Sequence, residues 1–568
     1  MSLSLTYPGV YVREIPSGVH TITGVATSIT AFVGAAPRGP EDTPVTLNSY
    51  SDFERVFGGL WAPSTLGYAV RDFFLNGGGQ AIVVRLFNAD PGAPDPTSRI
   101  KVGAFAFAAA SRGTWGARLR ASIDRTVSAD VAASYGLAAS DLFNLTVREV
   151  DATGATVSRE VFRNLSVKDS PRRVDKVLGA QSSLLRWDGA WPPNPLPAIA
   201  AGDDDLTRTA AAQASAAADY AAAKAATPQV PATIAADQSA LDAATAAAAA
   251  AVSAAGGSNG RALTKADNFT PAGAQANKKG LYALEVADLF NLLCIPPYTA
   301  GGDVETSLVS DAAAYCEQRR AFLLVDPPSG WVDKATAKAQ FSDPQTDTVG
   351  TRSKNAALFF PRLLQPNPLH DNQVEMFVPC GALAGVMART DGERGVWKAA
   401  AGVQATLANV PQLSVSLTDA ENGELNQLGV NCLRSFPVAG KVVWGARTLR
   451  GADQLADENK YIPVRRTTLF IEESLRRGLQ WVVFEPNDDP LWAQIRLNVG
   501  AFMQNLFRQG AFQGASPREA FFVKCDSETT TPNDINLGVV NVMVGFAPLK
   551  PAEFVVITIQ QMAGQVAA

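Results

Sequence analysis

The apolar positions of the chain follow two different periods. Alternating or continuous apolar residues predict strands at residues 27–34 and 81–86, and apolar residues at helical spacing predict helices at 49–59 and 67–76 between them. Helix-like segments alternate with apolar strands again over residues 282–364. We therefore predict a mixed α/β core to which two separate parts of the chain contribute.

The stretch between these two parts changes character twice. Residues 101–195 have the alternation of short strands separated by polar turns. Residues 210–255 are more than half alanine, the strongest helix former, and two prolines interrupt them. We predict an inserted β-rich domain that carries a helical hairpin with arms at 205–226 and 232–255. A flexible low-complexity linker is the alternative.

A long amphipathic helix is predicted near the C-terminus, where Asp488 or Asp489 is a suitable N-cap, Pro490 fits the first turn and Gly510 ends the helix. One face is apolar and is expected in the core. It comprises Leu491, Trp492, Ile495, Val499, Phe502, Met503 and Leu506. The residues that stay mostly on the polar face are Arg496, Asn498, Gln504, Asn505, Arg508 and Gln509.

Two pairs of opposite charge precede this helix. Glu472 and Glu473 each stand four residues before an arginine, Arg476 and Arg477 respectively. Because ion pairs at this spacing stabilise helices in water, we predict a short exposed helix here.

Each end of the chain carries a strand without a hairpin partner. The first lies between Pro8 and Pro16, and the second follows Pro548 and Pro551. A lone strand of about six residues is not stable in water, so each needs a partner within its own subunit or in a neighbouring one. The N-terminal strand comprises Val10, Tyr11, Val12, Arg13, Glu14 and Ile15. The C-terminal strand comprises Glu553, Phe554, Val555, Val556, Ile557, Thr558 and Ile559.

Composition argues against several classes of protein. The net charge of −5 gives no general electrostatic reason to bind nucleic acid, although local basic patches remain open. No signal peptide and no apolar run of about 18–20 residues is found, so we expect no membrane insertion. The five cysteines are scattered and form no CxxC pair, which favours a protein made in a cytoplasm.

Candidate chemistry is sparse. His20 and His370 lie in loop-like stretches without metal-ligand or acid–base partners nearby. The GxSxG match at 256–260 follows a polyalanine helix rather than a strand, and the glycines at 77–79 precede a strand, unlike a dinucleotide fingerprint. The aspartates at 203–205 suit a helix N-cap better than a calcium loop. We predict no catalytic residue, no cofactor and no metal site.

Several longer motifs occur in a fixed order. They are YPGVYVREI (7–15), TSITAFVG (27–34), RGP (38–40), NGG followed by VVR (76–85), VRRT (464–467), FEPN followed by LW (484–492), AFFVKCD (520–526), TPND (531–534) and APLKPAEFVV (547–556). With these motifs the chain resembles the contractile tail sheath proteins of phages and of pyocin-like and extracellular contractile injection particles. The resemblance covers about 1–95 and 275–568 and leaves out the inserted region.

The resemblance implies a multidomain sheath fold with a discontinuous α/β core and outward-facing insertions. The expected domains are an N-terminal exchange arm (1–20), the first part of the core (21–98), an inserted outer domain (99–270, β-rich at 101–195 and helical at 203–256), the second part of the core (271–440), an inner C-terminal domain (441–550) and a C-terminal exchange arm (551–568).

Sheath proteins are structural and non-enzymatic. The resemblance implies a helical homopolymer around an inner tube, with baseplate and terminal cap proteins as further partners. By the same resemblance, this homopolymer is expected to assemble in a bacterial or host cytoplasm, as part of a phage tail or a released particle. The polymer contracts from an extended, metastable state and drives the tube through a target envelope. Terminal arms add strands to the C-terminal domains of neighbours, and Arg496 and Arg508 are candidate contacts with acidic tube residues.

Two other classes remain as alternatives. One is a static structural protein, such as a tail-tube or capsid component built from similar arms. The other is an enzyme such as an α/β hydrolase, against which the sparse histidines and the context of the GxSxG match argue.

Overall fold

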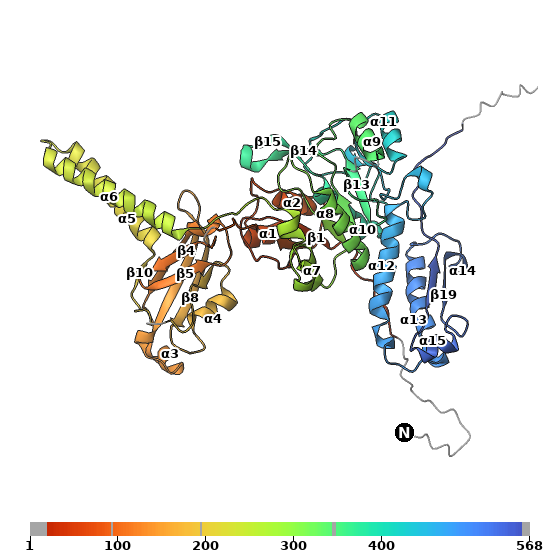
Figure 1. Cartoon of the computed structure of the whole chain (residues 1–568), viewed down its shortest axis with the longest axis horizontal. Helices are drawn as coiled ribbons and strands as arrows, with labels where there is room; N and C mark the ends of the chain where they lie inside the picture. Colours follow the sequence, from red (N-terminus) through yellow and green to blue (C-terminus); the bar gives the residue numbers. More distant parts are fainter. Residues whose placement is uncertain (1–19, 93–94, 194–195, 344–347, 559–568) are drawn as a thin grey trace, which may run out of the picture.

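The computed structural model describes residues 20–92, 95–193, 196–343 and 348–558. Helices and strands alternate in the central part of the molecule, a β-rich part with a protruding helical pair lies to one side, and a helical part with a small sheet lies to the other (Figure 1). The fold is thus mixed α/β, which confirms the predicted class. The N-terminal strand predicted at residues 10–15 lies outside the described residues.

An eight-stranded sheet forms the centre of the molecule, in the order β18-β17-β13-β12-β11-β1-β3-β2. The inner strands β17 to β3 pair in parallel, whereas β18 and β2 at the edges are antiparallel. The strands are β1 (Thr30–Gly34), β2 (Val45–Leu47), β3 (Ala81–Arg85), β11 (Leu292–Cys294), β12 (Phe322–Val325), β13 (Ala356–Phe360), β17 (Asn431–Phe436) and β18 (Gly440–Val443). The strand β1 pairs with β3 on one side and with β11 on the other, so the two separated parts of the chain share one sheet.

Helices cover both faces of this sheet and bury a separate apolar core on each. One face carries α1 (Tyr50–Phe57), α2 (Leu66–Leu75) and α10 (Cys380–Arg394), and the other carries α8 (Thr306–Arg319), α9 (Lys334–Ser342) and α11 (Asp419–Asn426). The helix α10 can approach α2 closely because Gly381 has no Cβ atom. A Cβ at this position would overlap the carbonyl oxygen of Ala69. Smaller elements at the edge of this layer are β14 (Leu363–Asn367), β15 (Gln373–Phe377), β16 (Gln412–Leu413) and α7 (Ala274–Asn277).

The β-rich part is inserted between β3 and β11. It contains the sheets β4-β5-β9 and β10-β6-β7-β8 around a core of its own. The elements are β4 (Arg99–Val102), β5 (Phe105–Ala109), β6 (Leu119–Asp124), α3 (Ala129–Ser134), β7 (Leu142–Val150), β8 (Thr156–Ser166), α4 (Val174–Gln181), β9 (Leu185–Trp187) and β10 (Gly202–Asp203).

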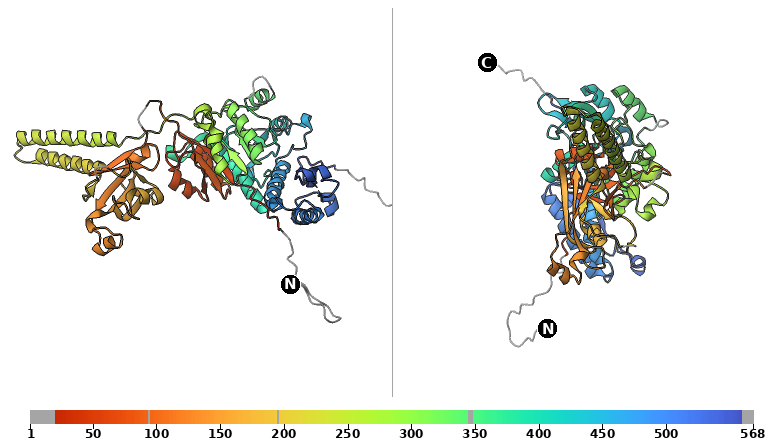
Figure 2. Two further views of the ribbon diagram at one scale, coloured as in Figure 1. Left: turned by 60° about the horizontal axis from the view of Figure 1, so that its bottom comes forward. Right: turned by 90° about the vertical axis from the view of Figure 1, so that its left-hand side faces the viewer.

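An alanine-rich helical hairpin projects from this inserted part. It consists of α5 (Asp205–Ala225) and α6 (Pro231–Ala255), which lie side by side and extend away from the rest of the molecule (Figure 2). Asp204 caps α5 by accepting a hydrogen bond from the backbone N–H of Thr207, as expected for this acidic stretch. Only Leu206 and Ala255, at the base of the hairpin, are buried.

The C-terminal part has its own apolar core, built on two long helices. Its elements are α12 (Ile462–Gly478), α13 (Asp489–Arg508), α14 (Pro517–Ala520), β19 (Phe521–Lys524), α15 (Pro532–Asn536) and β20 (Met543–Phe546). Asp488 is the N-cap of α13, because its carboxylate accepts a hydrogen bond from the N–H of Leu491. The seven residues predicted for the apolar face are all buried.

Two local predictions in this part are wrong. The segment around Glu473 is no short exposed helix but the second half of the 17-residue α12, and Glu473 is buried (5% exposed). It binds both Arg476 and Arg477. Asn498, predicted mostly on the polar face, is also buried and accepts a hydrogen bond from the backbone N–H of His20. In both cases a residue remote in sequence contacts the helix, Arg320 at Glu473 and His20 at Asn498.

Candidate assembly interface

The C-terminal part contains a sheet with open edges. The strands β19 and β20 pair antiparallel, and among the described residues they form a two-stranded sheet with no third member. Phe522 on β19 and Met543 on β20 expose about half of their surface. An exposed, short sheet of this kind presents unpaired N–H and C=O groups to any strand that approaches.

The segment that follows this sheet is apolar and exposed. Phe554, Val555, Val556 and Ile557 are between 76% and 89% exposed. Residues 553–558 pair with no strand of the described chain, and the segment leaves the folded part of the molecule (Figure 1). Four consecutive exposed apolar residues are costly in water, so this segment has the character of an interaction site. Ile559, the last residue of the predicted strand, lies outside the described residues.

A buried ion pair holds the base of this segment. Arg447 is fully buried, and its Nε and Nη2 donate to the two carboxylate oxygens of Glu553 at 2.8 and 2.6 Å. The Nη1 of Arg447 also donates to Asp453 at 2.9 Å, and Tyr461 donates to Glu553 at 3.3 Å. The carboxylates raise the pKa of Arg447 against the effect of burial, which lowers it. The chain therefore returns from the C-terminal part to the end of the central part before it leaves the molecule.

The two arginines predicted to contact an inner tube lie in different surroundings. Arg496 is half-buried and donates to the carbonyl oxygen of Cys525, whereas Arg508 is exposed at the C-terminal end of α13. Twelve residues separate them, which is about three and a third turns of helix, so they point in different directions. The structure does not bring them into one patch.

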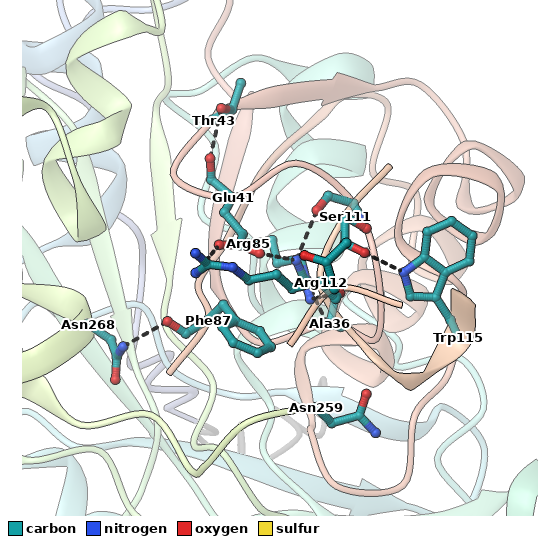
Figure 3. A network of polar contacts seen from close by, with 12 residues as sticks. Ala36, Glu41, Thr43, Arg85, Phe87, Ser111, Arg112, Trp115, Asn259 and Asn268 are labelled. Atoms are coloured by element: carbon teal, nitrogen blue, oxygen red, sulfur yellow. Dashed lines mark hydrogen bonds and ion pairs between the residues drawn. The ribbon is translucent and has the colours of Figure 1, made fainter. Parts of the chain in front are cut away.

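Another buried arginine joins the central part to the inserted part. Arg85, at the end of β3, is 1% exposed and donates to the carbonyl oxygens of Ala36, Gly39 and Arg112 and to the carboxylate of Glu41 (Figure 3). Burial lowers the pKa of Arg85, and the charge of Glu41 opposes this. The guanidinium of Arg112 also binds Glu41, and the side chains of Arg85 and Arg112 both lie over the ring of Phe87. This network fixes the base of the inserted domain.

The groups that enzymes use for chemistry are held in structural contacts. His20 stacks on Trp481, and His370 contacts the carboxylate of Glu375. All five cysteines are buried and free, and burial raises the pKa of each thiol. Within the described residues, no group of three or more His, Cys, Asp or Glu side chains is arranged to hold a metal ion.

None of the described helices is both long enough and apolar enough to span a membrane.

Two family models match the chain. The model described as phage tail sheath protein central domain matches residues 270–449, and the model described as phage tail sheath C-terminal domain matches residues 457–562. Together they cover just over half of the chain, including the central sheet from β11 onward and the sheet β19–β20. The class defined by these domains is that of contractile-tail sheaths, and the chain belongs to the phage tail sheath family.

Curated relatives agree with this assignment. The tail sheath protein of Burkholderia phage BcepMu is 28% identical over 266 residues, which are 44% of this chain and 53% of that protein. The tail sheath protein of Vibrio phage KVP40 is 28% identical over 166 residues, which are 29% of this chain and 23% of that protein. The chain thus spans about half the length of one curated relative and about a quarter of the other.

Solved structures share the fold over nearly the whole chain. The helical sheath of the anti-feeding prophage in its contracted state has a TM-score of 0.52 and 22% identity, covering 98% of this chain and 100% of that one. The contracted sheath complex of the extracellular contractile injection system PVC has a TM-score of 0.52 and 18% identity, with 99% of each chain covered. The sheath tail protein from Listeria innocua has a TM-score of 0.55 and 12% identity, covering 93% of this chain and 96% of that one.

Proposed function

We propose that this chain is the structural subunit of a contractile sheath. Many copies polymerise around an inner tube in an extended, metastable state, and the polymer contracts to drive the tube through a target envelope. The stored energy is the difference between two packings of the same subunit, so the subunit requires no catalytic site. The single observation that carries the proposal is the exposed apolar segment 554–557, which follows the anchored Glu553, in a chain that also contains a sheet with open edges.

Strand exchange is the proposed means of polymerisation. Residues 10–15 and 553–559 of one copy add strands to the sheet β19–β20 of neighbouring copies. Each added strand contributes about four to six backbone hydrogen bonds of about 0.5–1.5 kcal/mol each, so the links persist while weaker contacts between subunits exchange. Residues 553–558 pair with no strand among the described residues, which supports donation to another copy.

Membership of the family supports our proposal for the other partners and the site of assembly. Assembly takes place in the cytoplasm of a bacterium or host, and the polymer bears on a baseplate at one end and a cap at the other. Of the two arginines proposed to contact the tube, Arg508 is the better candidate because its side chain is exposed, whereas Arg496 is engaged with Cys525.

Electron microscopy of the purified chain tests the proposal. We expect hollow cylinders of the contracted kind, whereas narrow smooth tubes or closed shells would support a static structural protein instead. A variant lacking residues 1–16 should remain a folded monomer and form no stable cylinders. Cylinders of wild-type stability from this variant would contradict strand exchange by the N-terminal segment.

A further inference from the structure

The turn between α12 and α13 presents an aromatic side chain to solvent. Phe484 is fully exposed, and its backbone φ of 75° lies in the left-handed region that bulky residues avoid. Glu485, Asp488 and Asp489 follow it and are all exposed. An exposed aromatic residue in a strained backbone is costly in an isolated molecule, and such strain concentrates at functional sites. We call residues 483–489 the acidic knob.

A ring stack and two hydrogen bonds fix the conformation of the acidic knob. Trp481 stacks on His20 with ring centroids 4.2 Å apart, and Asn487 donates from its Nδ2 to the carbonyl oxygen of Val539 at 3.0 Å. The indole N–H of Trp492 donates to the Oδ1 of Asn487 at 2.8 Å. Because these contacts order the turn before any partner arrives, little entropy is lost when Phe484 inserts into a pocket.

A cleft of about 650 Å³ lies at the other end of the C-terminal part, where it meets the central part. Two indoles, Trp397 and Trp444, line it, and Trp444 is 36% exposed. Gln509 and Gly510, directly after α13, and residues 549–554 also line it. Its volume is within the range of sites that enclose a ligand. We call this cleft the cationic socket.

The charge of the cationic socket is uncompensated. Arg394, Lys398 and Lys550 line it, and among the described residues no carboxylate pairs with any of them. The one carboxylate in the lining, Glu553, has both oxygens bound by Arg447. Burial, and then the positive charge of Arg394, lower the pKa of Lys398. Cations held together in this way attract an acidic partner.

We propose that the acidic knob of one copy docks in the cationic socket of another, with Phe484 between Trp397 and Trp444 and the three knob carboxylates facing Arg394, Lys398 and Lys550. This contact rests on the proposed function, since it joins two sheath subunits. It differs from strand exchange in that side chains rather than backbone groups make the contact, although Glu553 and Phe554 belong both to the socket lining and to the proposed C-terminal arm. The proposed contact packs one aromatic side chain against aromatic rings. Around it, carboxylates of the acidic knob face cations of the cationic socket.

The positions of the two surfaces make the contact intermolecular. The acidic knob precedes the first residue of α13, and Gln509 and Gly510, directly after its last residue, line the cationic socket. A helix of 20 residues spans about 30 Å, so one copy cannot close the contact on itself. Two different patches at opposite ends give a head-to-tail contact, which generates a ring or an open helical filament rather than a closed dimer.

A pair of glycine substitutions tests the role of Phe484. F484G relieves the backbone strain, so its thermal unfolding midpoint should equal or exceed that of the wild type. Loss of the aromatic anchor should raise the concentration at which polymers form by at least about tenfold. V438G is the matched control, because Val438 is also fully exposed, lies in the turn after β17, and belongs neither to the acidic knob nor to the lining of the cationic socket. Its polymers should form at the wild-type concentration.

Cysteine cross-linking between two differently tagged full-length chains locates the contact. One chain carries V483C and the other A552C, which leave Phe484, Trp397 and Trp444 in place. Val483 is exposed next to Phe484, Ala552 lines the cationic socket, and the five native thiols are buried. A bismaleimide should join the two chains in polymers, and each chain alone should give no cross-linked product. If the wild type polymerises but the cross-link does not form and F484G assembles normally, the docking is wrong while the proposed function stands. A wild-type chain that never polymerises overturns both.

Discussion

Arg447 and Glu553 show how one residue pair decides where a chain segment leaves the molecule. The guanidinium is fully buried, and three of the four residues that accept its hydrogen bonds lie within residues 426–453, so it belongs to the central part. The fourth acceptor residue is Glu553, which follows the last strand of the C-terminal part in the chain. A buried arginine that lacks a carboxylate is unstable, and this requirement draws residue 553 back to the central part.

The substitution E553Q tests this role at the residue scale. Glutamine keeps the shape but loses the charge, so we expect the free energy of unfolding to fall by about 1–2 kcal/mol, because hydrogen bonds to charged groups are the strong ones. The C-terminal segment should also become more sensitive to protease. The control is R55Q, which removes the exposed pair with Asp52 and should cost at most about 0.5 kcal/mol in chemical denaturation.

A buried carboxylate makes the stability of the fold depend on pH. Burial raises the pKa of Asp326 to about 7, against hydrogen bonds from Cys380 and the charge of Arg362. The unfolded chain releases this proton near pH 4, so between about pH 4 and pH 7 the folded state binds more protons and the free energy of unfolding falls as the pH rises. Asp72, with a pKa raised by burial to about 6, acts in the same direction.

The variant D326N should therefore be more stable than the wild type at about pH 8, on the order of 1.4 kcal/mol for each unit of pKa shift removed. Urea denaturation at several pH values measures this, and the curve of D326N should be flatter than that of the wild type. Its slope should not vanish, because Asp72 still titrates. A wild-type protein that gains stability from pH 5 to pH 8 would show that these carboxyls do not dominate.

At the scale of elements, the alanine-rich hairpin is nearly independent of the rest. Its two helices lie against each other, and only Leu206 and Ala255 at its base are buried. Gln213 donates to Thr245 at 3.2 Å, so these positions face each other across the pair. Replacing residues 214–244 by a short Gly-Ser turn should leave the thermal midpoint of the remaining fold unchanged and reduce only the helical circular dichroism signal.

A substitution at the base of the hairpin should behave differently. Asp204 is fully buried, and its carboxylate accepts from the backbone N–H groups of Ala121 and Thr207, both at 2.8 Å. D204A should destabilise the inserted part by about 1–3 kcal/mol, because one buried N–H loses its acceptor and the helix its cap. Equal midpoints for D204A and the shortened hairpin would contradict this difference.

The element boundaries that the sequence predicts well are those fixed by local chemistry. Ser49 accepts from the N–H of Asp52 at the start of α1, and Gly58 ends that helix in the left-handed conformation. Asp488 does the same for α13. Caps act within a few residues of chain, so the sequence contains all the information they need.

At the scale of the whole molecule, the segment beyond Glu553 is separate from the folded parts. A chain that ends after Glu553 keeps the ion pair with Arg447, so we expect it to unfold at the temperature of the wild type. It lacks the exposed apolar residues 554–557 and should form no polymer under conditions in which the full chain does. Sedimentation velocity measures the second property and differential scanning calorimetry the first. Polymerisation of the truncated chain would show that the C-terminal segment is not required.

The sequence by itself determined locally capped helices such as α1 and α13, the mixed α/β class and the resemblance to tail sheath proteins, because periodicity, caps and long motifs are local properties of the chain. Only the tertiary structure showed that Glu473 and Asn498 are buried, that Arg496 is engaged while Arg508 is free to contact solvent, and that Arg447 meets Glu553. Burial and ion pairing depend on which remote segment covers a residue. That information lies in the packing of the whole chain and not in the period of any one segment.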